Sequence, residues 1–428
     1  MIDQSPAPPC LVKILSGYTD KVSYMPGDEM LVFLQSNSKI KCGVSIYDGS
    51  GKFIARYDAN LFMQKIKNSN PWENGFGYSV SAEIRLPETL TSGFYTIENS
   101  IPFIVKSSSS SDITIVYPIN TINAYDDSGG KSLYPFNSTN SVAAQSVSVL
   151  RPIDSFSDQL DYCLPCLAWF PSFSDIKVNY IADMDLETYS NITQTKILIV
   201  IGHSEYWTRS SRQNFDNFVN TGGHAIIMSG NTMWWQARYS NNYENLVCYR
   251  DASSDPEPNP YLKTIEWADS TLHFPILESI GADFNLGGYG LLQDNGWDGY
   301  KIFNPESPLL EGLNFKKGDT LSLPTGEYDG APTRGFDSDG FPLLDNSKLK
   351  FNRLELIGFD KGSREGNETI ATFIVFQKTT ASGIIINMAS DCWCSSTGFG
   401  SAKSGNQIKA ITRNAIYKLL NGLSVFSR

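Results

Sequence analysis

One stretch of the chain has the hydrophobic pattern of a strand, a helix and a second strand in succession. Ile197 to Ile201 is a continuous apolar run of the kind that is buried on both faces in a parallel sheet. Apolar residues then recur at helical spacing between positions 215 and 219, and a Gly-Gly pair ends this predicted helix. Ala225 to Met228 has the composition of the next strand. The pattern predicts a β-α-β unit with two parallel strands.

Polar residues follow both of these predicted strands. Ligands bind at the carboxyl ends of strands in open α/β sheets, because loops converge there without disturbing the covered sheet faces. We therefore expect a functional site at this edge, with His203 and Glu205 as a general base or as support for it. The candidate pocket residues, which come from neighbouring strand ends, are Asn123, Asn231, Trp234 and Trp235.

The first 108 residues have a different pattern, in which short alternating segments are separated by turn signals. This spacing predicts an antiparallel, immunoglobulin-like (Ig-like) β-sandwich over residues 1–108. Its expected strands include Lys21–Tyr24, Met30–Leu34, Val44–Tyr47, Ala82–Leu86, Ser92–Ile97 and Ile101–Val105. The serine run Ser107 to Ser111 has no apolar surface to bury and marks the domain boundary.

From residue 109 to residue 428 strands alternate with helices, which predicts a doubly wound, mostly parallel α/β domain. The fold class is thus α/β plus all-β. Residues 239 to about 360 are rich in Gly, Pro, Asn, Asp and aromatic residues, and we expect them to form a long loop-rich insertion. The other expected elements are a loop from Asn120 to Tyr134, a helix at 162–170, strands at 113–117, 178–181, 372–376 and 383–388, and a helix at 407–420.

Composition restricts the classes of partner. The chain has 428 residues, 41% hydrophobic and 18% charged, which is ordinary for a globular protein with more than one core. Its net charge of −11 comes without any basic stripe, which argues against nucleic acid as a partner. The sequence has no apolar run of about 18 residues and no signal-peptide pattern, so we expect no membrane association and a cytoplasmic location.

Cysteine and histidine usage narrows the chemistry further. Seven cysteines form no regular framework and predict reduced thiols, and the pairs Cys163/Cys166 and Cys392/Cys394 favour buried structural thiols over a zinc site. The chain has three histidines, which leaves few ways to build a catalytic triad or a zinc centre. His224 and His273 have settings typical of structural residues, whereas His203 lies at a predicted strand end.

The order of strands and helices favours a class I glutamine amidotransferase-like architecture. Enzymes of that architecture carry a nucleophilic cysteine on a tight turn after a central strand. The turn after Ile201 lacks the small residues of such an elbow, and Cys392 lacks flanking glycines. We therefore do not expect covalent thiol catalysis.

Several segments together resemble one known family. They are GYTDKVSYMPGD (17–28), NAYDDSGGKSLY (123–134), GHSEYWT (202–208), GGHAIIMSGNTMWWQAR (222–238), LVCYRD (246–251), PTGEYDGAP (324–332) and GIIINMASDCW (383–393). Over nearly its whole length the chain is similar to the C-terminal domain of the large subunit of N,N-dimethylformamidase and to proteins like it.

The resemblance implies an amidohydrolase with one iron ion held by two tyrosines and one glutamate. By motif, Tyr206 matches the first tyrosine and Glu327 the glutamate, while Tyr249 matches the second tyrosine, with Tyr243 close by as an alternative. A phenol keeps its proton unless a strong cation displaces it. A hard trivalent ion does so more readily than a soft divalent one, so this ligand set favours ferric iron (Fe3+) over zinc or copper.

Three functions remain open from the sequence. The first is metal-dependent hydrolysis of a C–N bond in a small amide, by a protein that forms a homo-oligomer or requires a small partner subunit. The second is a non-catalytic or carbohydrate-directed protein on the same scaffold, because a fold alone does not fix a function. The third is a structural or adhesion protein, which only the predicted sandwich domain suggests. Ser204 and the GEYDG segment depart from the family pattern, which leaves the identity of the substrate open.

Overall fold

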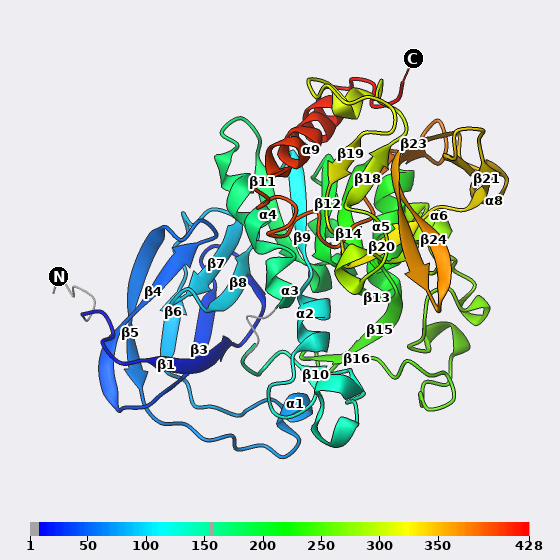
Figure 1. Cartoon of the computed structure of the whole chain (residues 1–428). Coiled ribbons are helices and arrows are strands. Elements are labelled where there is room, and N and C mark those ends of the chain that lie inside the picture. Colours follow the sequence, from blue (N-terminus) through cyan, green and yellow to red (C-terminus); the bar gives the residue numbers. More distant parts are fainter. Residues whose placement is uncertain (1–7, 154–157, 428) are drawn as a thin grey trace.

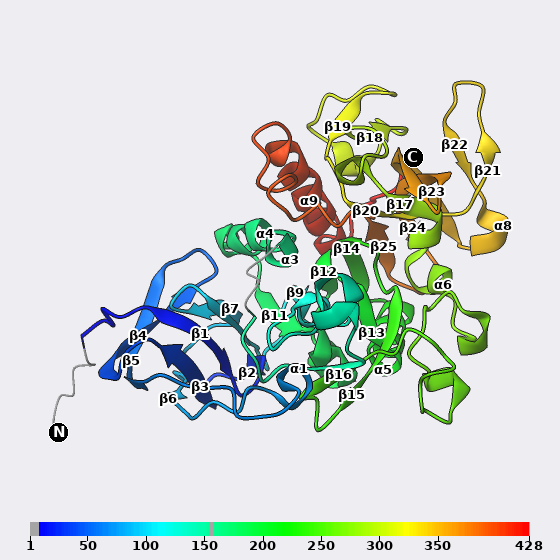
Figure 2. The same ribbon diagram turned by 60° about the horizontal axis from the view of Figure 1, so that its bottom comes forward.

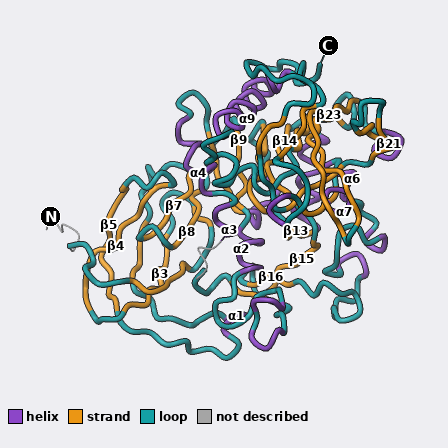
Figure 3. The backbone as a smooth tube through the Cα atoms, in the orientation of Figure 1, coloured by secondary structure: helices purple, strands orange, loops and turns teal. Residues whose placement is uncertain are grey.

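The computed structural model of the chain describes residues 8–153 and 158–427, and it shows a mixed α/β protein with many strands and few helices. The strands gather in two groups, and most of the helices belong to the larger group (Figure 3). The N-terminal strands lie at one side of the molecule and the remaining strands at the other (Figure 1).

The N-terminal residues form two sheets around a shared core. One sheet has the order β1-β3-β6 and the other β2-β8-β7-β4-β5. In β3, every second side chain is buried, as expected for a strand with one face on a core. The bounds are β1 Ile14–Thr19, β2 Ser23–Tyr24, β3 Glu29–Ser36, β4 Ile40–Asp48, β5 Phe53–Leu61, β6 Ala82–Arg85, β7 Gly93–Ile97 and β8 Ile101–Val105. Each of the expected strands overlaps a strand of the structure, whereas β1 and β5 were not among them, and the Ig-like arrangement stays a prediction.

The larger sheet begins with five parallel strands in the order β11-β9-β12-β14-β25. They are β9 Ile113–Tyr117, β11 Val178–Ala182, β12 Ile197–His203, β14 His224–Gly230 and β25 Ile384–Asn387. The predicted β-α-β unit is confirmed, because β12 and β14 pair in parallel and are joined by helix α5 (Arg209–Asn220).

The same sheet continues as antiparallel strands. The long strands β23 (Arg353–Arg364) and β24 (Asn367–Gln377) pair with each other, and β24 pairs with β25. Beyond them lie β17 Gly288–Tyr289, β18 Gly299–Ile302, β19 Thr320–Ser322 and β20 Glu327–Gly330. Residues 239–360 were expected to form a loop-rich insertion above a mostly parallel sheet. They instead supply antiparallel strands to the sheet itself.

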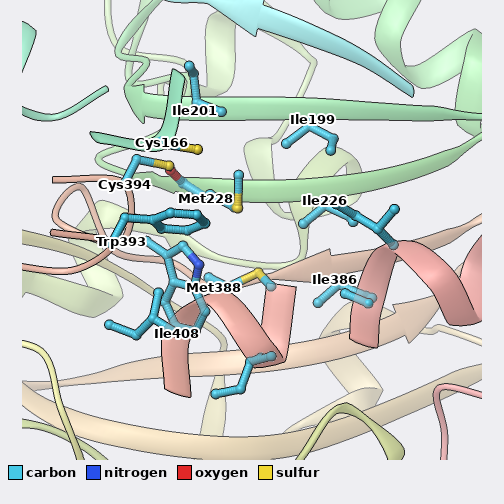
Figure 4. Close-up of a cluster of buried hydrophobic side chains, with 14 of the residues drawn as sticks. Cys166, Ile199, Ile201, Ile226, Met228, Ile386, Met388, Trp393, Cys394 and Ile408 are labelled. Atoms are coloured by element: carbon cyan, nitrogen blue, oxygen red, sulfur yellow. The ribbon is translucent and has the colours of Figure 1, made fainter. Parts of the chain in front are cut away.

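Alternate residues of β12 point into two separate cores. Ile199 and Ile201 pack with helix α9 (Gly405–Leu420), whereas Leu198 and Val200 pack with α5. The two helices therefore cover opposite faces of the sheet. Figure 4 shows the α9 side, where Ile199, Ile226, Met228, Trp393 and Ile408 meet in one apolar cluster. The C-terminal helix expected at 407–420 is confirmed.

Smaller elements complete the fold. A sheet of order β10-β16-β15-β13 borders the parallel strands, and the hairpin β21–β22 projects at the far edge (Figure 2). Residues 119–125 form helix α2, so the first part of the loop expected from Asn120 to Tyr134 is helical. Remaining bounds are α1 Pro71–Asn74, α2 Ile119–Tyr125, α3 Asp158–Asp161, α4 Leu164–Trp169, α6 Ile276–Ile280, α7 Phe284–Gly287, α8 Asn346–Leu349, β10 Ser146–Ser148, β13 Tyr206–Thr208, β15 Trp235–Ser240, β16 Asn245–Val247, β21 Thr333–Phe336 and β22 Pro342–Leu344.

The serine run lies at the junction of the two groups of strands. The Ser107 backbone N–H and the Ser92 hydroxyl both donate to the side-chain oxygen of Asn179 on β11. Lys106 forms an ion pair of 2.5 Å with Asp185, whose carboxylate also accepts a bond from Ser23. The two parts of the chain are thus fastened together by polar contacts, and the division at residue 108 stays a prediction.

The cysteine expectation was partly wrong. Cys10 and Cys42 form a disulfide, which joins the N-terminal segment to β4. Cys163, Cys166, Cys248, Cys392 and Cys394 are free and buried, as expected for structural thiols. Because disulfides are rare in reducing compartments, the bond weighs against the cytoplasmic location, which stays a prediction. Among the described residues, no helix is long and apolar enough to cross a membrane.

Reduction of the Cys10–Cys42 bond is expected to lower the free energy of unfolding by about 3 kcal/mol, because the bond closes a long loop in the unfolded chain. Urea denaturation with and without a phosphine reductant measures this difference. The double variant Cys10→Ser/Cys42→Ser is the control, since the reductant should not change its stability. An unfolding midpoint that does not respond to reduction in the unmodified chain would show that the bond is absent.

Candidate active site

The candidate site is centred on the carboxyl ends of two adjacent parallel strands. The register of β12 on β14 places His203 opposite Gly230, so the residues that follow each strand emerge side by side. His203, Glu205 and Asn231 are all almost completely buried, with exposures of 3%, 2% and 4%. The structure therefore brings these three sequence-predicted residues to the same edge of the sheet.

His203 lies between two carboxylates. Its Nε2 atom is 3.1 Å from Glu327 Oε2 and 3.6 Å from Glu205 Oε2. On the other side of the ring, Nδ1 is 3.1 Å from Gln159 Oε1. The Asn231 side-chain amide donates to the same Glu327 oxygen at 2.9 Å. Glu327, which lies far away in sequence, thus belongs to the same cluster.

Three tyrosines surround Glu205. The Tyr134 hydroxyl donates to the Glu205 carboxylate, with distances of 2.8 Å and 2.9 Å to its two oxygens. Tyr125 packs on Tyr134 with ring centroids 4.3 Å apart. Tyr206 is fully buried, and its hydroxyl lies near Tyr134 without a hydrogen bond of normal geometry in the part of the chain that the structure describes. Tyr125 and Tyr134 were not among the residues predicted from the sequence, although both lie in the segment 123–134.

A close backbone approach positions Glu327. A Cβ atom on Gly230 would stand 2.1 Å from the Glu327 carbonyl oxygen and 2.5 Å from the Asp391 nitrogen, so this position needs a glycine. Asp391 in turn accepts hydrogen bonds from the backbone N–H groups of Gly326 and Glu327 through its carboxylate. The segments at 230, 327 and 391 are therefore locked together directly beside the cluster.

Arg151 fixes the segment that carries Tyr125 and Tyr134. Its buried guanidinium donates to the backbone carbonyls of Asn123, Asp126, Ser128 and Lys131. It also donates to the Asn123 side-chain oxygen at 3.1 Å, while the Asn123 amide nitrogen contacts the Val147 carbonyl. Asn123, a predicted pocket residue, is thus engaged in anchoring this segment.

Burial and mutual contact shift the pKa values of the cluster. Burial disfavours the charged form of His203, but the carboxylates of Glu327 and Glu205 outweigh it and raise the pKa of His203 to about 9. Burial raises the pKa of Glu205 to about 7 against the pull of His203. For Glu327 burial acts to raise the pKa, but the charge and hydrogen bond of His203 together with the hydrogen bond of Asn231 and the charge of Arg364 outweigh burial and lower it. Burial raises the pKa values of Tyr125, Tyr134 and Tyr206 well above the usual range, so these phenols hold their protons.

The remaining predicted residues are Trp234, Trp235 and Tyr249, with Tyr243 as the alternative to Tyr249. Trp234 is buried and Trp235 partly buried, and their ring centroids are 6.0 Å apart. Tyr249 is partly buried, and its backbone N–H donates to Thr264 Oγ1. Tyr243, the alternative to it, is 47% exposed and packs on Tyr239. For neither Tyr249 nor Tyr243 do the described residues show a hydrogen bond to the carboxylate cluster, whereas the next residue, Arg250, stacks on Tyr134.

Asp255 holds the segment that carries Tyr249 and Arg250. Its buried carboxylate accepts two bonds from Arg238, at 2.7 Å and 2.9 Å, and two from the backbone and hydroxyl of Thr264. Thr264 then accepts the backbone N–H groups of Tyr249 and Arg250. Burial raises the pKa of Asp255, but the bonds from Arg238, Glu257 and Thr264 outweigh it and lower that pKa well below the usual range.

The donor atoms beside Tyr206 suit a hard cation. Glu327, Glu205 and the phenols offer oxygen, and the buried Tyr206 hydroxyl lacks a normal hydrogen bond among the described residues. Within the same residues, no group of three or more His, Cys, Asp and Glu side chains is arranged to hold a metal ion. The oxygen atoms of Tyr206 and Glu327 have the chemistry that the implied ligand set requires, and iron binding by Tyr206, Glu327 and Tyr249 stays a prediction.

Replacement of Asp255 by asparagine should lower the free energy of unfolding by about 3 kcal/mol near neutral pH, because it leaves the partly buried Arg238 without its charged partner. The folded-state pKa of Asp255 lies below the unfolded value of about 4. Its contribution is therefore complete above about pH 4 and is lost as the pH falls through the folded-state pKa. Urea denaturation of both chains between about pH 3 and about pH 7 measures the difference in the free energy of unfolding. Asp339→Asn is the control, because Asp339 is exposed. A stability difference that stays constant over this range would contradict the assignment.

Comparisons with known proteins complete this description. No curated protein matches the chain. Two of the similar solved structures have low identity to the chain. One is "mmIFT52 N-terminal domain", which is 11% identical, with a TM-score of 0.32 over 58% of this chain and 86% of that chain. The other is a "Putative thua-like protein" from Bacteroides uniformis, which is 11% identical, with a TM-score of 0.35 over 73% of this chain and 93% of that chain. Likenesses this weak carry no argument. Residues 57–406 match the family described as "N,N-dimethylformamidase beta subunit-like, C-terminal", and the chain belongs to that family.

Proposed function

We propose that the protein is a metal-dependent amidohydrolase that cleaves the C–N bond of a small amide, as the family's name indicates. The observation that carries this proposal is the buried cluster of His203, Glu205 and Glu327 beside Tyr206. Carboxylates and phenols at the carboxyl edge of a parallel sheet can hold a cation and move protons. The match over residues 57–406 supports the same chemistry.

Tyr206, Glu327 and Tyr249 are the residues that would hold iron in this proposal. A ferric ion held by these residues would supply Lewis acidity toward an amide carbonyl and toward water. Asn231 orients the Glu327 carboxylate by its 2.9 Å hydrogen bond. The phenols keep their protons in the cation-free protein, so metal binding would release protons from the tyrosines.

Glu205 and His203 serve as the proton-handling pair in this proposal. Tyr134 donates to the Glu205 carboxylate and fixes its position, while His203 lies within 3.6 Å of Glu205 and 3.1 Å of Glu327. A proton removed from water can be held at Glu205 and returned to the leaving nitrogen. The reaction consumes one water and yields a carboxylic acid and an amine.

The proposal also includes the fold of each part of the chain and a partner subunit. Helices α5 and α9 on opposite faces of β12 support a doubly wound, glutamine amidotransferase-like second part, and the two sheets around one core support an Ig-like first part. The family's name refers to a beta subunit, which supports a partner subunit.

Iron should co-purify with the native chain, and the loaded protein should hydrolyse N,N-dimethylformamide. Glu327→Gln should abolish both, because the substitution removes a charged oxygen donor. Elemental analysis, an assay for released dimethylamine and circular dichroism measure metal, activity and fold. Glu368→Gln is the matched control, since Glu368 is exposed on β24 and pairs with Lys361. Stoichiometric zinc without iron would contradict the ligand assignment, and a Glu327→Gln protein that keeps its metal but loses stability would make Glu327 structural.

A further inference from the structure

Arg250 lies against the aromatic side of the candidate site. Its guanidinium carbon is 4.3 Å from the centroid of the Tyr134 ring and 5.6 Å from the centroid of the Trp235 ring. Tyr134 is the residue whose hydroxyl binds Glu205, and the charge of Arg250 acts on Tyr206 as well. Arg250 is therefore a cation at the edge of the proposed catalytic cluster.

Arg250 differs from the other arginines of the interior in its hydrogen bonds. Arg151 donates to carbonyl groups, Arg212 to Ser279 and two carbonyls, and Arg238 to the Asp255 carboxylate. Arg250 is partly buried, yet over residues 8–153 and 158–427 its guanidinium has no hydrogen-bond acceptor and no carboxylate within ion-pair distance. A guanidinium offers five N–H donors, and the Arg250 nitrogens are not among the buried partnerless atoms of the described residues, so these donors are accessible to a ligand.

The backbone holds Arg250 in this position. Its φ angle is 57°, in the left-handed region that residues with a side chain seldom adopt. The N–H of Arg250 donates to the Thr264 carbonyl at 2.8 Å, and Thr264 is fixed by the Asp255 carboxylate. A strained conformation that the surroundings enforce in this way is typical of residues that contact ligands.

We propose that Arg250 binds a carboxylate group of the substrate, so that the preferred substrates are small amides with an anionic end. This inference rests on the proposed function, since it names the substrate class of the same site. The planar guanidinium matches a carboxylate with two parallel hydrogen bonds, which a neutral dialkylformamide cannot accept. In a chain with a net charge of −11, a local cation is also needed to hold an anionic substrate beside Glu205 and Glu327.

The reaction on such a substrate keeps the same balance of atoms. The oxygen of water adds to the carbon of the amide carbonyl, the C–N bond breaks, and the nitrogen takes up a proton. N-formylglycine and water would give formate and glycine. The carboxylate on Arg250 takes no part in the bond changes, so Arg250 determines specificity and does not handle protons.

The test compares N-formylglycine with N-ethylformamide, which lacks the carboxylate. For the unmodified chain we expect the higher kcat/KM with N-formylglycine. Arg250→Gln should lower that kcat/KM by about 10- to 100-fold, the effect of losing hydrogen bonds to a charged group, and leave that of N-ethylformamide and the iron content unchanged. Arg250→Lys should retain part of the preference. Arg353→Gln is the matched control, because Arg353 also stacks on an aromatic ring, that of Phe426, on strand β23.

Equal losses with both amides, or loss of iron in Arg250→Gln, would overturn the proposal and make Arg250 a residue that balances charge near Tyr206. A calorimetric titration with propionate separates this inference from the proposed function. If no amide is hydrolysed, the amidohydrolase proposal fails. Propionate binding that Arg250→Gln abolishes and Arg353→Gln preserves would still support the anion site, whereas no binding to the unmodified chain would overturn it.

Discussion

The candidate site depends on one close contact between backbones, where Gly230 at the end of β14 meets Glu327 at the start of β20. No side chain fits between them, because a Cβ atom would stand 2.1 Å from the Glu327 carbonyl oxygen. This approach sets the distance between the parallel half of the sheet, which carries His203 and Asn231, and the antiparallel half, which carries Glu327. The hydrogen bonds of Asp391 to Gly326 and Glu327 hold the second half in place. The carboxylate of Glu327 reaches His203 as a result.

Two polar networks play the same role for the other side of the site. Arg151 donates hydrogen bonds to carbonyl groups of the segment 123–131, and Asp255 accepts hydrogen bonds from Arg238 and Thr264. Both are buried charges with several partners, an arrangement in which removal of one partner leaves an uncompensated charge. Tyr134 and Arg250 are therefore placed by groups that themselves lie outside the cluster. The stacking of Arg250 on Tyr134 joins the two networks.

The sequence predicted the parts of the structure that follow from local periodicity. The apolar run at 113–117 is β9, the run from Ile197 begins β12, and the helical pattern near the end is α9. It did not predict that residues 239–360 would lengthen the sheet, because β17 and β20 have only two and four residues and gain their pairing from distant strands. Tyr134 was missed for a similar reason, since its partner Glu205 is 71 positions away. The disulfide between Cys10 and Cys42 was not predicted, because an odd number of cysteines without a regular framework favoured reduced thiols.

The separation of the site residues along the chain has a consequence for folding. Asn231 and Glu327 are 96 positions apart, and Tyr134 and Glu205 are 71 apart, so each contact closes a long loop. Contacts of this kind form after local ones, because their entropic cost must be met before they stabilise the chain. The cluster is thus completed only when β20 has joined the sheet beside β14. A nascent chain that ends before residue 327 has His203 and Glu205 but not the second carboxylate, so the polar cluster cannot form until the ribosome has added Glu327.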